Sequence, residues 1–599
     1  MHSNFTETSD PVATEEASVY STSMQMDWKE KCIEIEKKLK LAEEKLKKAE
    51  KESEINQKKL TEADKIIKRN EKLRIRMKRS HQSTYKKLKR KINNLETKHA
   101  TFSQHFEKIF TPDQVDLITK KYKKIPEWHN DSLKKAFKYK FACGISGYEE
   151  IITSGIPLPC NRTLTRQLEG WRFKAGILNK VFEFLEAKVP AFSDQRDKDC
   201  VIVIDEVAIT SGKIYDPADG SFLGYVTLHK DTNPTEIAES GLVFMLAGIG
   251  GRWKQPVAFH FTNKSTDGSL YYPVLIELLK KCEKIGLRVR GIISDMAGAN
   301  QGLWRIFGIS VSRYSLTKNK CSNPSNKDRQ LYFFHDPAHA WKNFKEGFFN
   351  AGFITIPDKF VKKYNLPTSK ATISHFKHLV DTQNNSELLL TPGLNDEMLV
   401  AGHFKKMRVE NTSNVLSHNV SAALSFLSEA QNLPELRTTA WLVSMLSRWW
   451  RIVSCRNLSL ALSKKNPQVY KETVDFLKEF IELISGLSIS ANGHWKPFQT
   501  GLIISTQSLI ELAAELLNEN YDFVIPGRFS QDCLENLFSA LRVKNMVMNA
   551  LQFKNNLKLI SVALYMRTPS GSSYNEDDRN YLLDFLTNLK VKKKEKINP

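Results

Sequence analysis

The chain has 599 residues and a formal net charge of +22, with a pI of about 9.4. This length allows several domains, and the charge favours a polyanionic partner such as nucleic acid, because each Lys or Arg on a phosphate releases condensed counterions. The eight cysteines form no close pairs, which argues against a disulfide framework and a CxxC-type zinc module. The N-terminus lacks a secretory pattern and the longest apolar runs are too short to span a bilayer, so we expect an intracellular protein with no membrane partner.

Residues 1–26 are polar and acidic, which predicts a disordered N-terminus. From Asp27 a heptad pattern begins, and it predicts a coiled coil over 27–105 and a homodimer or higher homo-oligomer. Asn56 at an a position would fix the register, whereas the alternative is a single solvated Lys/Glu-rich helix. The residues that recur every seventh position are Cys32, Leu39, Leu46, Ser53, Leu60 and Ile67.

The second half of this helix is strongly basic. The stretch Asp64 to Leu95 holds thirteen Lys or Arg against two Asp or Glu, a net charge of +11 and half that of the whole chain. Such density fits a nuclear-import signal or a phosphate-binding strip, although a charge run is usually only a solvated face. We expect a nuclear protein.

Residues 106–190 are expected to form short helices. Pro157 and Pro159 break the chain, and Asn161 or Thr163 is suited to cap the helix that follows. This pattern predicts a helix-turn-helix-like DNA-binding domain, although many helical hairpins have no DNA role. The nearby basic residues are Arg162, Arg166 and Arg172.

After Lys198 the pattern changes to buried strands. The strand-like apolar runs are VIVID, FLGYVTL, LVFMLAGIG, QPVAFHF and GIISD, and a helix from Tyr272 to Gly286 precedes the last of them. Strands alternating with a helix predict an α/β sheet, which makes the chain a mixed α and α/β multidomain protein. We assign 198–349 to the first part of this core, 350–500 to a mostly helical insertion, 501–585 to the C-terminal part of the core, and 586–599 to a basic tail.

Three carboxylates are candidate metal ligands. Asp205 and Asp295 end similar apolar strands, at the rim where open α/β sheets present ligands, and Glu535 lies in an amphipathic helix. Three such groups can hold two Mg²⁺ or Mn²⁺ ions that activate a water or a 3′-hydroxyl for in-line attack on phosphorus. Spacing alone leaves a second reading open, in which the aspartates cap helices or pair with arginines.

Several blocks, in order along the chain, resemble the P-element family of DNA transposases and their THAP-type relatives. They include VIVIDEVAI, GIISDMAGANQGLWRIFGI, YFFHDPAHAWKNF and SQDCLENLFSALR, within about residues 106–580. The resemblance implies an RNase H-like core interrupted by a GTP-binding insertion, which cuts transposon ends and joins them to target DNA with GTP as a cofactor. It places the D-D-E catalytic and metal-binding positions on Asp205, Asp295 and Glu535.

The chain departs from the family pattern in two places. The family usually begins with a THAP zinc finger, but the first 140 residues here contain only Cys32, so we expect no such finger. The guanine-contacting Asp and Asn of the family are replaced by Arg451 and Ser454. Because an Arg offers only donors, we expect GTP binding to be weakened. The nucleotide-contact positions implied by the resemblance are Arg408, Val409, Ser417, Trp450, Arg451, Ser454 and Asp532.

Two functions compete. The retained carboxylates favour an active D-D-E transposase, a metal-dependent nuclease and strand transferase. The missing finger and the altered nucleotide segment favour a domesticated transposase-derived protein that binds DNA and regulates without transposing. A coiled-coil scaffold with an inert α/β domain is a third reading.

Overall fold

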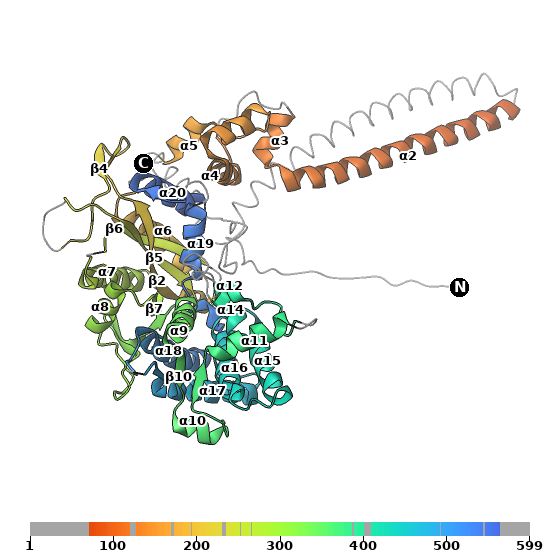
Figure 1. Ribbon diagram of the computed structural model, residues 1–599. Coiled ribbons are helices and arrows are strands. Elements are labelled where there is room, and N and C mark those ends of the chain that lie inside the picture. Colours follow the sequence, from red (N-terminus) through yellow and green to blue (C-terminus); the bar gives the residue numbers. More distant parts are fainter. Residues whose placement is uncertain are drawn as a thin grey trace, which may run out of the picture. The chain divides into compact units, whose positions relative to one another are not determined.

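The computed structural model describes most of the chain beyond residue 70 (Figure 1). The described ranges are 71–119, 127–168, 173–192, 194–229, 235–251, 253–264, 266–385, 389–399, 409–491, 493–542 and 546–563. The predicted heptad positions, the first 26 residues and the basic tail lie outside them.

The described residues belong to two units, one formed by the chain up to residue 133 with 152–159, the other by 134–151 with the rest. In the first unit, helix α2 (Glu71–Ile109) continues the charged segment and α3 (Pro112–Ile118) follows it. Asp113 accepts hydrogen bonds from the backbone of His129 and from Ser132, which fixes the start of α4 (Asn130–Thr153) against α3. Of the residues expected to form short helices, 106–190, the described ones contain α3, α4, α5 (Asn161–Leu168) and α6 (Asn179–Lys188), with the short strand β1 (Gly176–Ile177) before α6.

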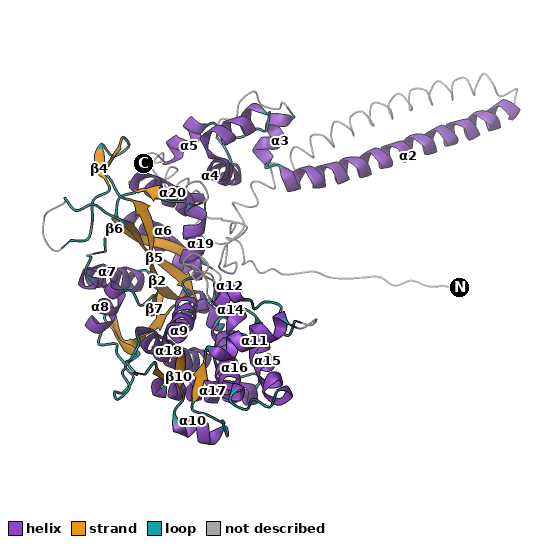
Figure 2. Cartoon of the chain, in the orientation of Figure 1, coloured by secondary structure: helices purple, strands orange, loops and turns teal. Residues whose placement is uncertain are grey.

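The second unit is built on one mixed sheet with strand order β1-β6-β5-β2-β7-β9-β8, and β13 pairs with the end of β2 (Figure 2). β2, β7 and β9 run parallel, whereas β5 and β6 pair antiparallel on the other side of β2. β2 is buried along its first seven residues, which explains why its sequence is a continuous apolar run instead of an alternating one. The strands are β1 (Gly176–Ile177), β2 (Asp199–Thr210), β5 (Ser240–Gly248), β6 (Lys254–Thr262), β7 (Arg288–Ser294), β8 (Lys320–Asn323), β9 (Asn326–His335) and β13 (Met548–Asn549).

Helices cover both faces of this sheet (Figure 1). They are α6 (Asn179–Lys188), α7 (Tyr271–Lys284), α8 (Gly298–Ile306), α9 (Pro337–Ala351), α18 (Pro497–Asn518), α19 (Asp532–Leu541) and α20 (Ala550–Ala563). α18 is long and apolar enough to cross a membrane by composition, but 72% of its apolar window is buried and it packs on β9, α9 and α17 (Pro467–Gly486). Gly501 permits this close packing, since a Cβ there would lie 2.3 Å from the His335 ring. α18 is thus a core helix.

A mostly helical segment separates α9 from α18, as the sequence predicts. Its centre is aromatic: Trp449 stacks on Phe480 at 5.3 Å between ring centroids and donates a hydrogen bond to Thr506 of α18. The segment therefore shares its core with the sheet domain. Its helices are α10 (Asp358–Lys363), α11 (Ser374–Asn384), α12 (Asp396–Leu399), α14 (Val409–Val415), α15 (His418–Ala430), α16 (Leu436–Val453) and α17, and a small sheet joins β11 (Lys370–Thr372), β10 (Phe353–Thr355) and β12 (Ser488–Ile489).

The structure differs from the sequence-based expectation in two details. The sheet domain begins earlier than residue 198, because β1 adds an edge strand to β6 and α6 follows it. The run FLGYVTL, expected as a strand, forms only β4 (Ser221–Leu223) and an isolated bridge at Tyr225.

Candidate active site

Asp205 and Asp295 lie side by side because of the register between β2 and β7. Ile202 pairs with Ile292 and Val203 with Ile293, so two residues further along this parallel register Asp205 comes beside Asp295. Residues two apart on a strand share a face, and neighbouring strands are about 4.8 Å apart. The two aspartates therefore meet at the point where β7 ends.

Glu535 is brought to this point by the start of α19. Gln531, at the N-cap, donates its side-chain amide to the Ile204 carbonyl at 2.6 Å, immediately beside Asp205. The backbone N–H of Gln531 donates to Asp336, whose other oxygen caps α9 by accepting from the His339 N–H. These bonds fix the first turn of α19 against the middle of β2, beside Asp205.

The electrostatics show that the three carboxylates are close. Burial raises the pKa of Asp205 well above its ordinary value, and the negative charges of Glu535 and then Asp295 raise it further. Within the described residues, neither Asp205 nor Asp295 has an ion-pair partner, and the Glu206 N–H is the donor to Asp205. The cluster therefore holds repelling negative charge at low solvent exposure.

Asp295 is oriented by its own loop. Its Oδ1 accepts from the Ala297 N–H at 3.0 Å and from the Asn300 side-chain amide at 2.6 Å. These donors turn the carboxylate back toward α8.

Two functional candidates were not predicted from the sequence. His339 on α9 lies with Nε2 3.5 Å from Glu535. Burial favours a lower pKa for His339, but the carboxylates of Glu535, Asp336 and Asp295 together outweigh it and the pKa is raised. Glu206 accepts a hydrogen bond from Tyr271, and burial raises its pKa. No sequence signal separates this histidine from others in the chain, since only the packing of α9 on α19 brings it to Glu535.

The donor set fits a hard divalent cation, because Mg²⁺ and Mn²⁺ prefer carboxylate oxygens and a cation would relieve the repulsion. The side chains do not converge on one point as they stand. Across the residues that the structure describes, no group of three or more His, Cys, Asp or Glu side chains is arranged to hold one metal ion. In this arrangement Asp295 is bonded to its own loop and to α8, and Glu535 contacts His339.

The predicted nucleotide positions lie on α14, α15, α16 and α19 or at their ends, apart from Arg408. Trp450 stacks on Trp341 with ring centroids 5.3 Å apart and planes 5° apart, and Trp341 also donates to Ser413 of α14. Asp532 is ion-paired with Arg456 and accepts from Ser530 at 2.7 Å.

Val409 begins α14, and Ser417 is the N-cap of α15. Ser454 is the C-cap of α16 and donates to the Trp450 carbonyl. Arg451 is exposed, and Arg408 lies outside the described residues. Most of these side chains thus already have partners within the chain.

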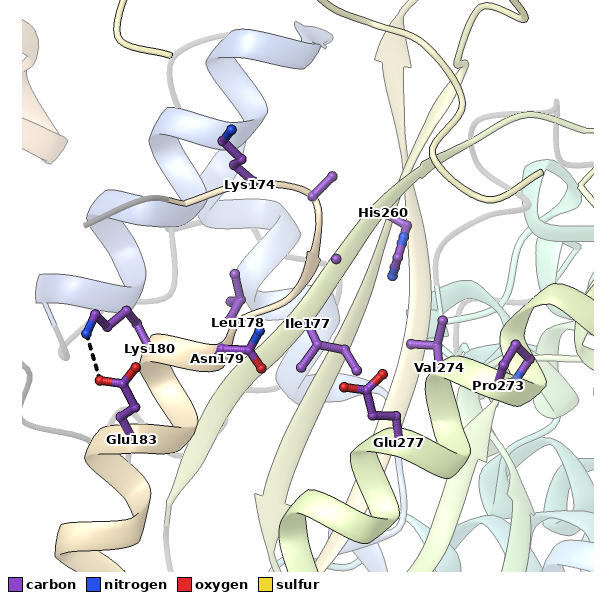
Figure 3. Close-up of a pocket in the computed structure, with 12 residues that line it drawn as sticks. Lys174, Ile177, Leu178, Asn179, Lys180, Glu183, His260, Pro273, Val274 and Glu277 are labelled. Atoms are coloured by element: carbon purple, nitrogen blue, oxygen red, sulfur yellow. Dashed lines mark hydrogen bonds and ion pairs between the residues drawn. The ribbon is translucent and has the colours of Figure 1, made fainter. Parts of the chain in front are cut away.

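A pocket of about 660 Å³ lies at the other side of the sheet, between β1, α6 and α7 (Figure 3). Ile177, His260 and Glu277 point into it. Burial lowers the pKa of His260 to about 4, so the ring is neutral at physiological pH. None of the three candidate carboxylates lines this pocket, so it is separate from the cluster.

The fold and the carboxylate cluster define an RNase H-like α/β domain interrupted by a helical insertion. Residues 173–308 match the TNP-like, RNase H N-terminal domain, and residues 359–467 match the TNP-like, GTP-binding insertion domain. The chain is homologous to the Transposable element P transposase of Drosophila melanogaster and to the DNA transposase THAP9 of Homo sapiens.

The first relative is 25% identical over 76% of this chain and 56% of its own length, and the second is 23% identical over 69% and 46%. The chain therefore spans about half the length of these relatives. A solved structure, the Drosophila P element transposase strand transfer complex, matches with a TM-score of 0.63 and 22% identity, covering 78% of this chain and 98% of that one. At this identity the match establishes a shared fold.

Proposed function

We propose that the protein is a P-element-type DNA transposase, a nuclease and strand transferase with a D-D-E site formed by Asp205, Asp295 and Glu535. The observation that carries the proposal is the register between β2 and β7, which brings two unpaired aspartates together, with the start of α19 fixed beside them. When bound, Mg²⁺ or Mn²⁺ would supply charge neutralisation and a nucleophile at neutral pH.

In this proposal the chain's own residues hold and orient the acidic groups. Gln531 and Asp336 fix α19 and α9 around the cluster, and Asn300 holds Asp295. His339 lies with Nε2 3.5 Å from Glu535 and has a raised pKa, so its protonated ring would offset part of the carboxylate's negative charge.

Binding of DNA is supported by two exposed basic surfaces. Arg162 and Arg166 are exposed on α5 (Asn161–Leu168), which is tied to α4 by a hydrogen bond between Asn161 and Glu149. This arrangement supports the predicted helix-turn-helix reader. A second surface lies on α2, and its exposed cations are Lys86, Lys87, Lys89, Arg90 and Lys91. Both basic surfaces are suited to bind DNA phosphates. Because a transposase acts on genomic DNA, we also propose that the protein acts in the nucleus.

The test is metal-dependent cleavage of DNA that carries the inverted repeats flanking the encoding locus. We expect nicking with Mg²⁺ or Mn²⁺ and a loss of at least about 1000-fold in Asp205→Asn, Asp295→Asn and Glu535→Gln, since several kcal/mol of transition-state stabilisation would be removed. Asp328→Asn, an exposed aspartate at the start of β9, is the matched control and should cleave normally. Equal cleavage by wild type and Asp205→Asn would overturn the catalytic proposal.

If the wild type binds these ends but never cleaves them, the second candidate holds, a transposase-derived DNA-binding regulator. The altered nucleotide segment favours this candidate, because the exposed Arg451 stands where the family has a carboxylate acceptor and Asp532 is already paired with Arg456.

We also propose that selectivity for guanine is lost. Calorimetric titration should give dissociation constants for GTP and ATP within about threefold of each other, because Arg451 cannot accept from the guanine edge. Arg451→Asp should restore a preference for GTP, whereas Arg451→Ala should not. Saturable micromolar binding of GTP but not ATP by the wild type would contradict this.

A further inference from the structure

A short hairpin after β2 exposes two aromatic rings. β3 (Ile214–Asp216) pairs antiparallel with β4 (Ser221–Leu223), and Tyr215 stands directly opposite Phe222. The ring centroids are 5.4 Å apart at 61°, and the two residues are 52% and 62% exposed. Single exposed apolar residues are common, but a contiguous exposed pair on a small element marks an interaction site.

The hairpin is firmly anchored. Lys554 of α20 is buried and pairs with Asp216 at 2.5 Å and with Asp219. Burying an ammonium group costs several kcal/mol unless it is well paired, so this contact is specific. At the base of the hairpin Gly224 lies against Gly212, where a Cβ would come within 2.0 Å of the Gly212 carbonyl oxygen.

The aromatic pair could serve only to stabilise the hairpin, since cross-strand aromatic pairs contribute about 0.5–1 kcal/mol. That role is already filled by the ion pairs of Lys554, which act on the turn and on β3. Because the rings remain largely exposed, most of their apolar surface is available to a partner.

The position of the hairpin indicates what that partner is. β2 carries Asp205, continues to Thr210 and leads into β3, so the Cα atom of Tyr215 lies at most roughly 34 Å from that of Asp205. The hairpin follows the carboxyl end of β2, which runs on for five residues beyond Asp205. An exposed cation lies at its base: Lys213 has its Nζ 5.1 Å from the centroid of the Tyr225 ring.

We propose that Tyr215 and Phe222 stack on unpaired bases of the DNA strand whose backbone is held at the carboxylates. The proposal rests on the proposed function, because it takes DNA as the substrate. Exposed aromatic rings beside cations are what proteins use to bind single strands, since each unpaired base offers a π-face and stacking contributes about 1–3 kcal/mol per base. In a paired duplex those faces are covered by neighbouring bases, so the hairpin selects DNA that is open near the site.

The experiment compares Tyr215→Ala/Phe222→Ala with wild type by fluorescence anisotropy, using a duplex that carries an unpaired 3′ extension and the same duplex with blunt ends, without divalent metal. We expect the double variant to lose about tenfold or more in affinity for the extended DNA and less than about twofold for the blunt DNA. Phe426→Ala is the matched control, since Phe426 is 57% exposed on α15. It should change neither affinity.

A second measurement keeps the proposal testable if the alanine variant folds poorly. Tyr215→Phe/Phe222→Trp retains both rings and should keep wild-type affinity, and 2-aminopurine in the extension should be quenched by wild type and by this variant only. Equal losses on both DNAs, a loss in Phe426→Ala, or unquenched 2-aminopurine would overturn the proposal. If one of these results is found but cleavage still depends on Asp205, only the inference about the hairpin fails. If the wild type binds neither DNA, the proposed function fails as well.

Discussion

The two ends of the β2–β7 strand pair carry acidic side chains in opposite electrostatic surroundings. At the beginning of the pair, Asp199 is fully buried and accepts from Arg288 and Arg290, and the Tyr521 hydroxyl donates to it as well. Arg290 also pairs with Glu515 and Glu519 at the end of α18. Every buried charge there has a partner.

At the other end Asp205 and Asp295 meet with no cation beside them among the described residues. A protein that only needed stability would have paired or removed these charges, since unpaired buried charge is costly. We infer that ion pairs stabilise the strand pair at the Asp199 end, whereas the carboxylates at the Asp205 end are suited to bind a ligand.

The largest effect is expected from removing Arg290, the buried cation that pairs with Asp199 at the beginning of the β2–β7 strand pair. Arg290→Ala leaves Asp199 buried with one arginine fewer and should lower the opening free energy of β2 and β7 by about 3–5 kcal/mol. Hydrogen exchange of the amides in these strands measures it. Arg288→Ala, at a more exposed partner of Asp199, should cost clearly less. Equal and small losses in both variants would show that this end does not hold the sheet.

The opposite result is expected at the carboxylate end. The raised pKa of Asp205 means that the folded state binds a proton at this carboxyl more tightly than the unfolded state does. The ionised Asp205 therefore lowers the free energy of unfolding, and this loss grows as the pH rises above the ordinary carboxyl pKa of about 4. In EDTA at pH 7, Asp205→Asn should therefore melt above the wild type, by about 2–4 °C for each kcal/mol gained. The advantage should disappear near pH 4.

Mg²⁺ should reverse this order. The wild type should gain about 1.4 kcal/mol at ten times the dissociation constant, and Asp205→Asn should gain nothing. If wild type and variant melt together at pH 7 with and without metal, the two ends of the strand pair do not differ in the proposed way.

The smallest effect should follow from loosening α19. Gln531→Leu leaves the buried Ile204 carbonyl without its donor and should cost about 1 kcal/mol of stability. Because Glu535 lies one turn further along, cleavage should fall by more than the stability change explains. Gln507→Leu, on α18, is the control and should leave cleavage unchanged. A cleavage loss in both variants alike would assign no positioning role to Gln531.

The sequence predicts strands β2 and β7 well but not the distant residues that contact their acidic and basic side chains. The apolar runs before Asp205 and Asp295 predict two buried strands that end in acids, and the structure contains both as neighbours in the sheet. The mixed α/β fold and the helical insertion are likewise confirmed. These features depend on local patterns, which a single sequence carries.

Features that depend on distant packing were missed. Arg290 meets Glu515 and Glu519 across 225 and 229 positions, and His339 reaches Glu535 through the packing of two helices. β9 is the third parallel strand, beside β7. It begins with the polar residues NKDRQ, which show no apolar pattern that would predict a strand. Nothing in their local sequence distinguishes these residues from solvated ones.

The bond between Gln531 and Ile204 joins positions 327 residues apart. At a synthesis rate of roughly 5–20 residues per second, β2 emerges from the ribosome roughly 15–65 s before its last acidic neighbour exists. A nascent chain can thus build most of its sheet before the helix that carries Glu535 exists. Under the proposed function, the three carboxylates would therefore be complete only after the final helices have been synthesised.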